Sequence, residues 1–328
     1  MVGACIIGSG TYAQVHARAL KSDPRVNLKW VWSPNPANRQ RFAQRFGTSA
    51  GDDWRRCIED RDVRAVHVVT PDFAHTEYVV AALEAGKHVI VEKPMATSSE
   101  ECLRMLRARD RSGARLMVNF HNRWYPAFRK AAEVVASGQI GRPVLARFVL
   151  SDTLTWTQTS MRWADRSGPE WFLMPHIADL ACWILDDAPS LVFSLAREGL
   201  LASKGLATRD LVSAMLRMRG GAVVHLESSW ILPGGWRNPI NEMSVSVQGE
   251  SGRVDVNADY ENVSVVTDRF QTPFTLLALT EEPPIRDFIT CIVEDRPVPV
   301  TGEDGLRATR LIEAVVQSYT EGRPVALH

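Results

Sequence analysis

The stretch "VGACIIGSGTYA", residues 2–13, joins an apolar run to a glycine-rich segment. The segment has the form G-x-G-x-x-A, with its small residues at Gly8, Gly10 and Ala13. Gly8 permits a tight turn, Gly10 lets a pyrophosphate approach the backbone, and Ala13 allows a helix to pack closely on a strand. The stretch therefore predicts a buried strand followed by a phosphate-binding turn and a helix.

The composition is that of a globular protein large enough for two domains. The chain has 328 residues, of which 45% are hydrophobic and 23% are charged. Lys plus Arg and Asp plus Glu are balanced at 38 each. Because no net field attracts polyanions, we expect neither a nucleic acid nor a membrane as a partner.

The cysteines and the apolar runs indicate the compartment. The five cysteines are scattered and form no C-x-x-C pair, which predicts neither disulfides nor a metal site. The first apolar run ends at Gly8, and no run approaches the roughly 18 residues of a membrane span. The N-terminus also lacks the basic start of a secretion signal. We therefore expect a cytoplasmic protein.

Strands and helices alternate through the first 120 residues. Runs rich in β-branched and aromatic residues predict strands at 2–7, 27–32, 65–69, 88–91 and 116–120. Amphipathic patterns between them predict helices near 12–22, 38–46, 75–85 and 99–112. This alternation is typical of right-handed βαβ units. It predicts an α/β Rossmann domain, with a doubly wound parallel sheet, over residues 1–120.

The pattern changes after residue 120. One helix is expected near 126–137 and a last one near 305–321. Between them, strand-like runs lie at 144–150, 191–196, 212–218, 222–229, 243–248, 253–257 and 263–267. Turn signals such as Arg219-Gly220-Gly221 separate neighbouring runs, as in hairpins. We therefore expect an α+β domain with a large open antiparallel sheet over residues 121–328.

The glycine-rich turn also bears on the choice of cofactor. Ser9, Thr11 and Tyr12 surround the start of the first helix, whose N–H groups and dipole favour phosphates. An Asp or Glu at the end of the second strand normally binds the ribose hydroxyls of NAD. Residues 32–39, "WSPNPANR", contain no acid, and they place Ser33 there with Arg39 able to contact a phosphate. We therefore expect NADP(H), with NAD(H) as the alternative.

Four further segments carry a resemblance to a known family. They are "TPDFAH" at 70–75, "AGKHVIVEKP" at 85–94, "NRWYPAF" at 122–128 and "GQIGRP" at 138–143. Together with the glycine-rich start, they resemble the Gfo/Idh/MocA oxidoreductases, which include glucose–fructose oxidoreductase and inositol dehydrogenase. The resemblance covers essentially the whole chain. It implies a Rossmann domain, an open antiparallel sheet, and a homodimer or homotetramer formed through that sheet.

The triplet Glu92-Lys93-Pro94 follows a predicted strand at the carboxyl edge of the parallel sheet, where ligands bind in such folds. Lys93 can donate to a substrate hydroxyl and stabilise the alkoxide that forms as hydride leaves. We therefore predict that Lys93 is catalytic. The residues that we expect to contact the cofactor beyond the glycine-rich turn are Thr70, Pro71, Asp72, His75, Glu92, Lys93, Pro94 and Asn122.

A histidine lies in the apolar segment "WFLMPHIADL", residues 171–180. The resemblance implies a catalytic histidine in a pattern D-x-x-x-H-x-x-D, which this chain matches at His176 and Asp179 but not at Phe172. Pro175 is typical of a helix start, so the helix dipole favours a neutral ring at His176. Asp179 shares its helix face and can orient that ring. We predict that His176 is catalytic.

The departure at Phe172 leaves one question open. In family members that have an Asp there, the carboxylate assists the histidine in taking the substrate proton. Either His176 and Lys93 suffice in this chain, or another carboxylate, such as Glu170 or Glu227, has taken over that role.

Most of the tryptophans follow residue 120. Indole faces stack on the C–H surfaces of sugars, while polar neighbours bind the hydroxyl groups. The residues that we expect to line a site for a sugar-like substrate are Arg123, Trp124, Arg162, Trp163, Asp179, Trp230 and Trp236.

Three functions are compatible with these residues. The leading hypothesis is an NAD(P)-dependent dehydrogenase or reductase that acts on a CH–OH group of a sugar, polyol or derivative. A second is redox-neutral cleavage of glycosides with a tightly held cofactor. The third is a non-catalytic, nucleotide-dependent regulator, which the missing carboxylate favours and the presence of Lys93 and His176 opposes.

Overall fold

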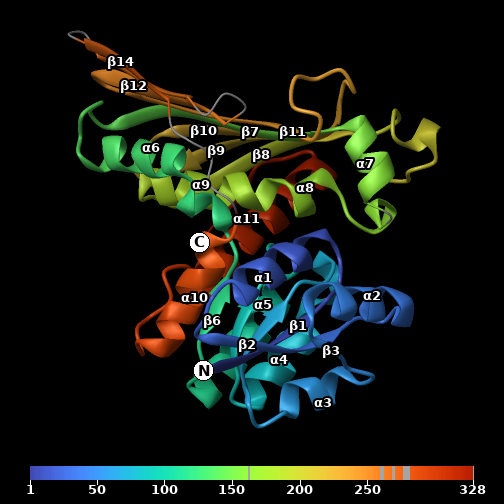
Figure 1. Ribbon diagram of the computed structural model, residues 1–328. Coiled ribbons are helices and arrows are strands. Elements are labelled where there is room, and N and C mark those ends of the chain that lie inside the picture. Colours follow the sequence, from blue (N-terminus) through green and yellow to red (C-terminus); the bar gives the residue numbers. More distant parts are fainter. Residues whose placement is uncertain (162, 259–261, 268–269, 276–280, 328) are drawn as a thin grey trace. The chain divides into compact units, whose positions relative to one another are not determined.

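The computed structural model describes residues 1–161, 163–258, 262–267, 270–275 and 281–327. The chain forms two compact units, each with its own core. Residues 1–121 and 280–309 form the first unit, and residues 122–279 and 310–328 form the second. Figure 1 shows a sheet with packed helices in each of them. The predicted domain limits, 1–120 and 121–328, remain a proposal.

The described part of the first unit contains a six-stranded parallel sheet in the order β3-β2-β1-β4-β5-β6. Its strands are β1 (Val2–Ile7), β2 (Val26–Trp32), β3 (Ser49–Ala50), β4 (Val63–Val68), β5 (His88–Val91) and β6 (Leu116–Val118). Strands β1 and β4 are almost wholly buried, as expected for strands with helices on both faces. This is the doubly wound fold that the sequence predicted.

Local sequence signals set the ends of the connecting helices, which are α1 (Thr11–Lys21), α2 (Pro36–Phe46), α3 (Trp54–Glu59), α4 (His75–Glu84) and α5 (Ser99–Ser112). The Asn35 side chain accepts from the backbone N–H of Asn38 at 3.0 Å and caps α2. Ser98 caps α5 in the same way. Gly113 ends α5 in the left-handed conformation that glycine adopts without steric cost.

A late segment of the chain completes the first unit. Helix α10 (Pro283–Val293) packs against α1 and β5, and the first residues of α11 (Gly302–Glu321) follow it there. Phe288 of α10 is fully buried, with its ring edge-on to His67 of β4 at 5.7 Å between centroids. The sequence did not predict α10 or its association with this unit.

The described part of the second unit forms a nine-stranded sheet in the order β14-β13-β12-β11-β7-β10-β9-β8-β15. Its strands are β7 (Pro143–Thr153), β8 (Pro189–Arg197), β9 (Leu211–Met218), β10 (Val223–Leu232), β11 (Asn241–Gly249), β12 (Gly252–Asn257), β13 (Asn262–Thr267), β14 (Phe270–Thr275) and β15 (Val325–Ala326). The predicted antiparallel sheet is confirmed for most neighbours. However, β7 and β10 pair in parallel, so the sheet is mixed.

Helices cover one face of this second sheet (Figure 1). They include α6 (Pro126–Ala136), α7 (Leu154–Ser160), α8 (Pro169–Phe172), α9 (Met174–Leu185) and the second half of α11. Along β10, Leu226 and Trp230 point into the core that α9 also contributes to. Glu227 lies between them in the alternation and points to the opposite side, which we call the outer face.

The outer face carries exposed apolar side chains on adjacent strands. Phe193 of β8 is paired with Met215 of β9, and Val223 of β10 is paired with Leu145 of β7. These four side chains and Leu195 are all at least one-third exposed. No helix of the described residues is long and apolar enough to cross a bilayer.

Candidate functional site

The glycine-rich turn lies between β1 and α1 and is shaped by close packing. Gly8 has a φ of 123°, and a Cβ added to it would lie 2.2 Å from the backbone oxygen of Val69. A Cβ on Gly10 would instead meet nothing within 4 Å. No side chain caps the start of α1. The turn therefore fits the pyrophosphate of a dinucleotide, because the backbone at Gly10 is open and the helix start that follows it has no side-chain cap.

The end of β2 lies beside this turn. The Ser9 hydroxyl donates to the Ser33 hydroxyl at 2.9 Å, and Ser33 is buried. The Arg39 guanidinium donates to the backbone oxygen of Ser33 at 3.0 Å. The position where an acid would bind ribose thus holds a neutral hydroxyl with a cation next to it.

His75 connects the two loops at the carboxyl edge of the first sheet. Its ring is 1% exposed, with Nδ1 2.8 Å from the backbone oxygen of Pro94 and Nε2 3.0 Å from that of Thr70. The predicted cofactor residue is therefore occupied with backbone contacts, which fix the loop after β4 against the loop after β5. Pro71 and Asp72 lie at the start of the short helix that precedes α4, and Asp72 is buried.

The triplet after β5 occupies the predicted edge of the sheet. The Lys93–Pro94 peptide is cis, and the Lys93 side chain is almost fully buried. The carboxylate of Glu92 is buried as well, and Oε1 accepts from Asn119 at 2.6 Å and from His16 at 2.9 Å. Burial by itself raises the pKa of Glu92, but the hydrogen bonds and charge of His16 and the Asn119 amide lower it to about 2.

His176 lies in the first turn of α9, as Pro175 predicted. Its Nδ1 lies 3.2 Å from the Asn122 side-chain nitrogen, and both residues are about 5% exposed. The sequence grouped Asn122 with the cofactor residues, whereas in the structure its amide contacts the predicted catalytic ring.

Asp179, the residue expected to orient His176, is held by Arg123. Arg123 Nε donates to Oδ2 at 2.8 Å, and its Nη2 donates to Oδ1 at 2.5 Å. The guanidinium also lies over the indole of Trp183 at 5.8 Å. Both charges are buried, so this bidentate pair fixes the short helix at residues 121–124 against α9. Two predicted substrate residues thus form a structural ion pair.

Phe172 stands in an aromatic cluster. Its ring lies 5.3 Å from that of Trp163 and 6.1 Å from that of Trp230, centroid to centroid. Trp230 is completely buried in the core, so the prediction that it stacks on a substrate is corrected: its faces are covered by protein. The place of the family carboxylate is therefore filled by apolar rings.

Both alternative carboxylates have other ionic partners. Glu170 accepts from Arg209 at 2.8 Å and from Tyr319 at 3.4 Å, and burial raises its pKa. Glu227 lies on the outer face of the second sheet, where it pairs with Arg147 at 3.0 Å. One side-chain partner of His176 is the Asn122 amide.

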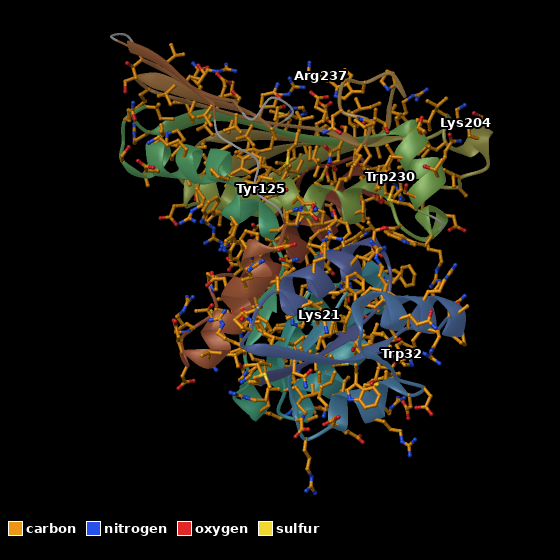
Figure 2. The ribbon with its side chains drawn as sticks, in the orientation of Figure 1. Lys21, Trp32, Tyr125, Lys204, Trp230 and Arg237 are labelled. Atoms are coloured by element: carbon orange, nitrogen blue, oxygen red, sulfur yellow. The ribbon has the colours of Figure 1, made fainter. Side chains whose placement is uncertain are left out.

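Of the remaining predicted substrate residues, Trp124 and Trp236 lie within the described part of the chain. Trp124 ends the short helix at 121–124, and Arg162 lies outside the described residues. Trp236 packs against the Arg237 guanidinium at 4.9 Å. Figure 2 shows Arg237 on the side of the second sheet opposite to Trp230. Composition indicated tryptophans for sugar binding, but it carried no information on which face of the sheet each one occupies.

His16 and Asn119, which contact the Glu92 carboxylate, were not predicted from the sequence. His16 follows the glycine-rich motif by three residues on α1, and His67 stands inside the apolar strand β4. A histidine within an apolar strand, such as His67, indicates that a hydrogen-bond partner is buried nearby. This was the sequence signal for a buried polar cluster.

The fold and the open turn define a dinucleotide-binding protein with a second α/β unit. Residues 2–120 match the family described as "Oxidoreductase family, NAD-binding Rossmann fold". Residues 132–327 match "Oxidoreductase family, C-terminal alpha/beta domain". The chain belongs to the Gfo/Idh/MocA oxidoreductase family, which confirms the resemblance seen in its sequence.

Relatives of known sequence include two named dehydrogenases. The chain is 27% identical over 329 residues to an inositol 2-dehydrogenase of Acidothermus cellulolyticus, covering 98% of this chain and 93% of the relative. It is 32% identical over 237 residues to a levoglucosan dehydrogenase of Pseudarthrobacter phenanthrenivorans, covering 66% and 58%. These relatives place the chain among dehydrogenases acting on CH–OH groups.

Solved structures share the fold along the entire chain. A probable dehydrogenase from Thermotoga maritima is 25% identical with a TM-score of 0.83, covering 99% of this chain and 98% of that one. A levoglucosan dehydrogenase in complex with NADH and L-sorbose is 24% identical with a TM-score of 0.89, covering 100% and 99%.

The two glycines of the turn should respond differently to substitution. Gly10→Ala should unfold like the wild type, because its Cβ enters open space, but should weaken NAD(P)H binding about tenfold by blocking the pyrophosphate. Gly8→Ala should lose about 3 kcal/mol of unfolding free energy, because its Cβ meets the Val69 oxygen at a positive φ. Urea unfolding and cofactor titration by fluorescence test both. Unchanged cofactor affinity in Gly10→Ala would contradict the assignment of the turn.

Proposed function

We propose that this protein is an NAD(P)-dependent dehydrogenase that acts on a secondary hydroxyl of a sugar or polyol, or on the corresponding ketone. The proposal rests above all on the contact between Asn122 and His176 in the first turn of α9, within a chain of this oxidoreductase family. The names of the inositol and levoglucosan dehydrogenases support the class of substrate. The position of Lys93 after β5 supports the class of reaction.

His176 takes or returns the hydroxyl proton at Nε2 in this proposal. The Asn122 amide holds the ring through Nδ1. An amide offers a donor on one side and an acceptor on the other, so it can pair with either state of Nδ1 after a rotation. When its oxygen accepts from Nδ1–H, the Nε2 lone pair becomes the base. Asn122 thus orients His176 without the carboxylate that Phe172 replaces.

Lys93 donates a hydrogen bond to the substrate oxygen and stabilises its negative charge as the proton leaves. A buried ammonium is effective in this role because the low surrounding polarity strengthens its field. The nicotinamide ring, when bound, supplies the hydride acceptor or donor. Ser9, Thr11, Tyr12 and the backbone at Gly10 would hold the cofactor phosphates.

Removal of either proposed catalytic side chain should slow turnover with little effect on cofactor binding. His176→Ala and Lys93→Met should each lower kcat about 10²- to 10⁴-fold. Asn122→Leu should lower it about tenfold, because the ring loses its orienting partner. Rates are followed by nicotinamide absorbance against sugars, polyols and lactones, with Kd for the cofactor measured in parallel.

His88→Gln is the matched control for these variants. His88 begins β5 at the opposite edge of the sheet, and its Nδ1 accepts from the backbone N–H of Arg115. A glutamine oxygen can replace that acceptor, so this variant should keep wild-type kcat. Full turnover by His176→Ala would rule out the proposed base.

We also propose NADP(H) as the preferred cofactor, because Arg39 lies beside Ser33 where an acid would bind ribose. Ser33→Asp should shift the ratio of affinities for NADH over NADPH upward by about tenfold or more, through repulsion of the 2′-phosphate and new bonds to ribose. Arg39→Ala should weaken NADPH binding and leave NADH binding almost unchanged. Competitive titration of both cofactors measures these ratios. A wild-type protein that binds NADH alone would overturn the preference.

The outer face of the second sheet supports a homo-oligomer. Phe193 and Met215 form one apolar pair on β8 and β9, Val223 and Leu145 form a second on β10 and β7, and Leu195 beside Phe193 is 62% exposed. Such patches are typical of interaction surfaces. We propose that a second copy of the chain covers this face, in a dimer or tetramer in the cytoplasm.

A charge placed on the outer face should dissociate that oligomer. Leu195→Glu should yield a folded monomer by light scattering after gel filtration, because the buried carboxylate opposes association. Lys204→Glu, in a turn of the same unit, serves as the charge-change control. A wild-type monomer at micromolar concentration would exclude this part of the proposal.

A further inference from the structure

Four polar side chains form a buried cluster beneath the loop that carries Lys93. They are His16 of α1, His67 of β4, Glu92 after β5 and Asn119 after β6, and each is at most 5% exposed. His16 Nε2 lies 2.9 Å from Glu92 Oε1, and His16 Nδ1 lies 2.9 Å from His67 Nδ1. All four belong to the first unit, and the proposed reaction uses none of them directly.

A stabilising role does not account for this cluster. Burying a carboxylate costs free energy, and well-packed apolar side chains often stabilise a core as well as a buried ion pair does. Buried charges are instead concentrated near functional groups. Here the charged member directly precedes Lys93, and its backbone N–H donates to Val68 at 2.9 Å, which fixes the start of the loop.

Two arrangements of hydrogens on His16 and His67 fit these distances, and both place a hydrogen on His16 Nε2. Burial and the nearby His16 hold the pKa of His67 well below its usual value, so His67 is neutral. Either His16 donates to His67 through Nδ1, or His67 donates to His16. Because one nitrogen of His16 faces a carboxylate, Nε2 carries a hydrogen in both cases and donates to Glu92.

Several titratable groups lie around the loop among the described residues. Besides Glu92, they include His16 on α1, Lys93 itself, and Glu281, whose carboxylate lies 3.8 Å from His121 Nε2. Burial lowers the pKa of His121, and the charges of Glu281, Glu92, Lys93 and His16 all act on that ring. His16, Glu92, Lys93 and His121 are buried, and Glu281 lies at the edge of this region, so their charges influence one another more strongly than they would in water.

We propose that His16 is a positioning residue for Lys93: by donating to Glu92 it keeps that buried carboxylate ionised, and the negative charge holds Lys93 as an ammonium. The proposal rests on the catalytic role given to Lys93 above. It also assigns a second task to α1, because the helix that receives the cofactor phosphates at its start anchors the Lys93 loop through its middle.

The first measurement needs no substrate. His16→Phe removes the donor, so Glu92 should take up a proton at neutral pH and show the infrared carbonyl band of a carboxylic acid. The double variant His16→Phe/Glu92→Gln should lack that band. His16→Gln retains an amide donor and should resemble the wild type. His67→Phe removes a buried histidine without removing the donor to Glu92, so it should also lack the band.

The second measurement follows Lys93 itself, in the presence and absence of NADPH. The ε-carbon signals of ¹³C-lysine-labelled protein are titrated by NMR, and Lys93→Arg assigns the resonance. Loss of the neighbouring negative charge makes the ammonium less favourable, so in His16→Phe the midpoint for Lys93 should fall by about one pH unit or more. The alkaline limb of kcat/KM should move with it. His16→Gln should restore both.

Glu92→Gln keeps the test decisive if His16→Phe does not fold, because it removes the same charge with little change of shape. An unchanged Lys93 midpoint in Glu92→Gln, or an equal change in His67→Phe and His16→Phe, would overturn the proposal. These readouts do not depend on the reaction. If Lys93→Met retains activity while the midpoints shift as expected, the catalytic assignment fails and the charge coupling stands.

Discussion

The passage from β1 to α1 runs so close to the end of β4 that only a glycine fits at position 8. This contact fixes where α1 begins, and hence where its uncapped N–H groups point. The same edge of the sheet receives the ends of β4 and β5, and His75 joins their loops through the oxygens of Thr70 and Pro94. One steric constraint on the backbone thus places the phosphate-binding turn and the Lys93 loop on a common edge.

Much of the fold was predictable because its signals are local. Apolar runs, the glycine-rich motif and helix caps such as Asn35 each act within a few residues, and the predicted strands of both sheets are confirmed. The association of α10 with β4 and β5 was not predictable, because an apolar helix face does not show which distant strands it packs against. The parallel pairing of β7 and β10 depends likewise on contacts between strands far apart in the sequence.

The same distinction holds for the candidate site. Pro175 placed His176 in the first turn of a helix, which is a local property. Its contact with Asn122 arises because the helix at 121–124 packs on α9, and no spacing rule predicts that. Trp230 was assigned to the substrate because tryptophan suits sugars, but a residue type does not reveal whether its ring is covered.

The two proposed catalytic groups are supported in different ways. His176 is oriented by a neutral amide, which imposes no fixed charge and accommodates more than one state of the ring. Lys93 follows a carboxylate that two donors keep ionised in a dry region. In the proposed reaction, His176 thus has a neutral amide partner, and Lys93 follows an ionised carboxylate.

The division of the first unit between two stretches of chain has a consequence for its synthesis. Phe288 reaches His67 only after the intervening residues of the second unit have been made. The second sheet, for its part, gains the edge strand Val325–Ala326 from the end of the chain. Neither unit can be completed on the ribosome before the other is nearly finished. Chains that stop early would therefore expose apolar surface in both units at once. A chaperone or protease would then act on one species in which both units are incomplete.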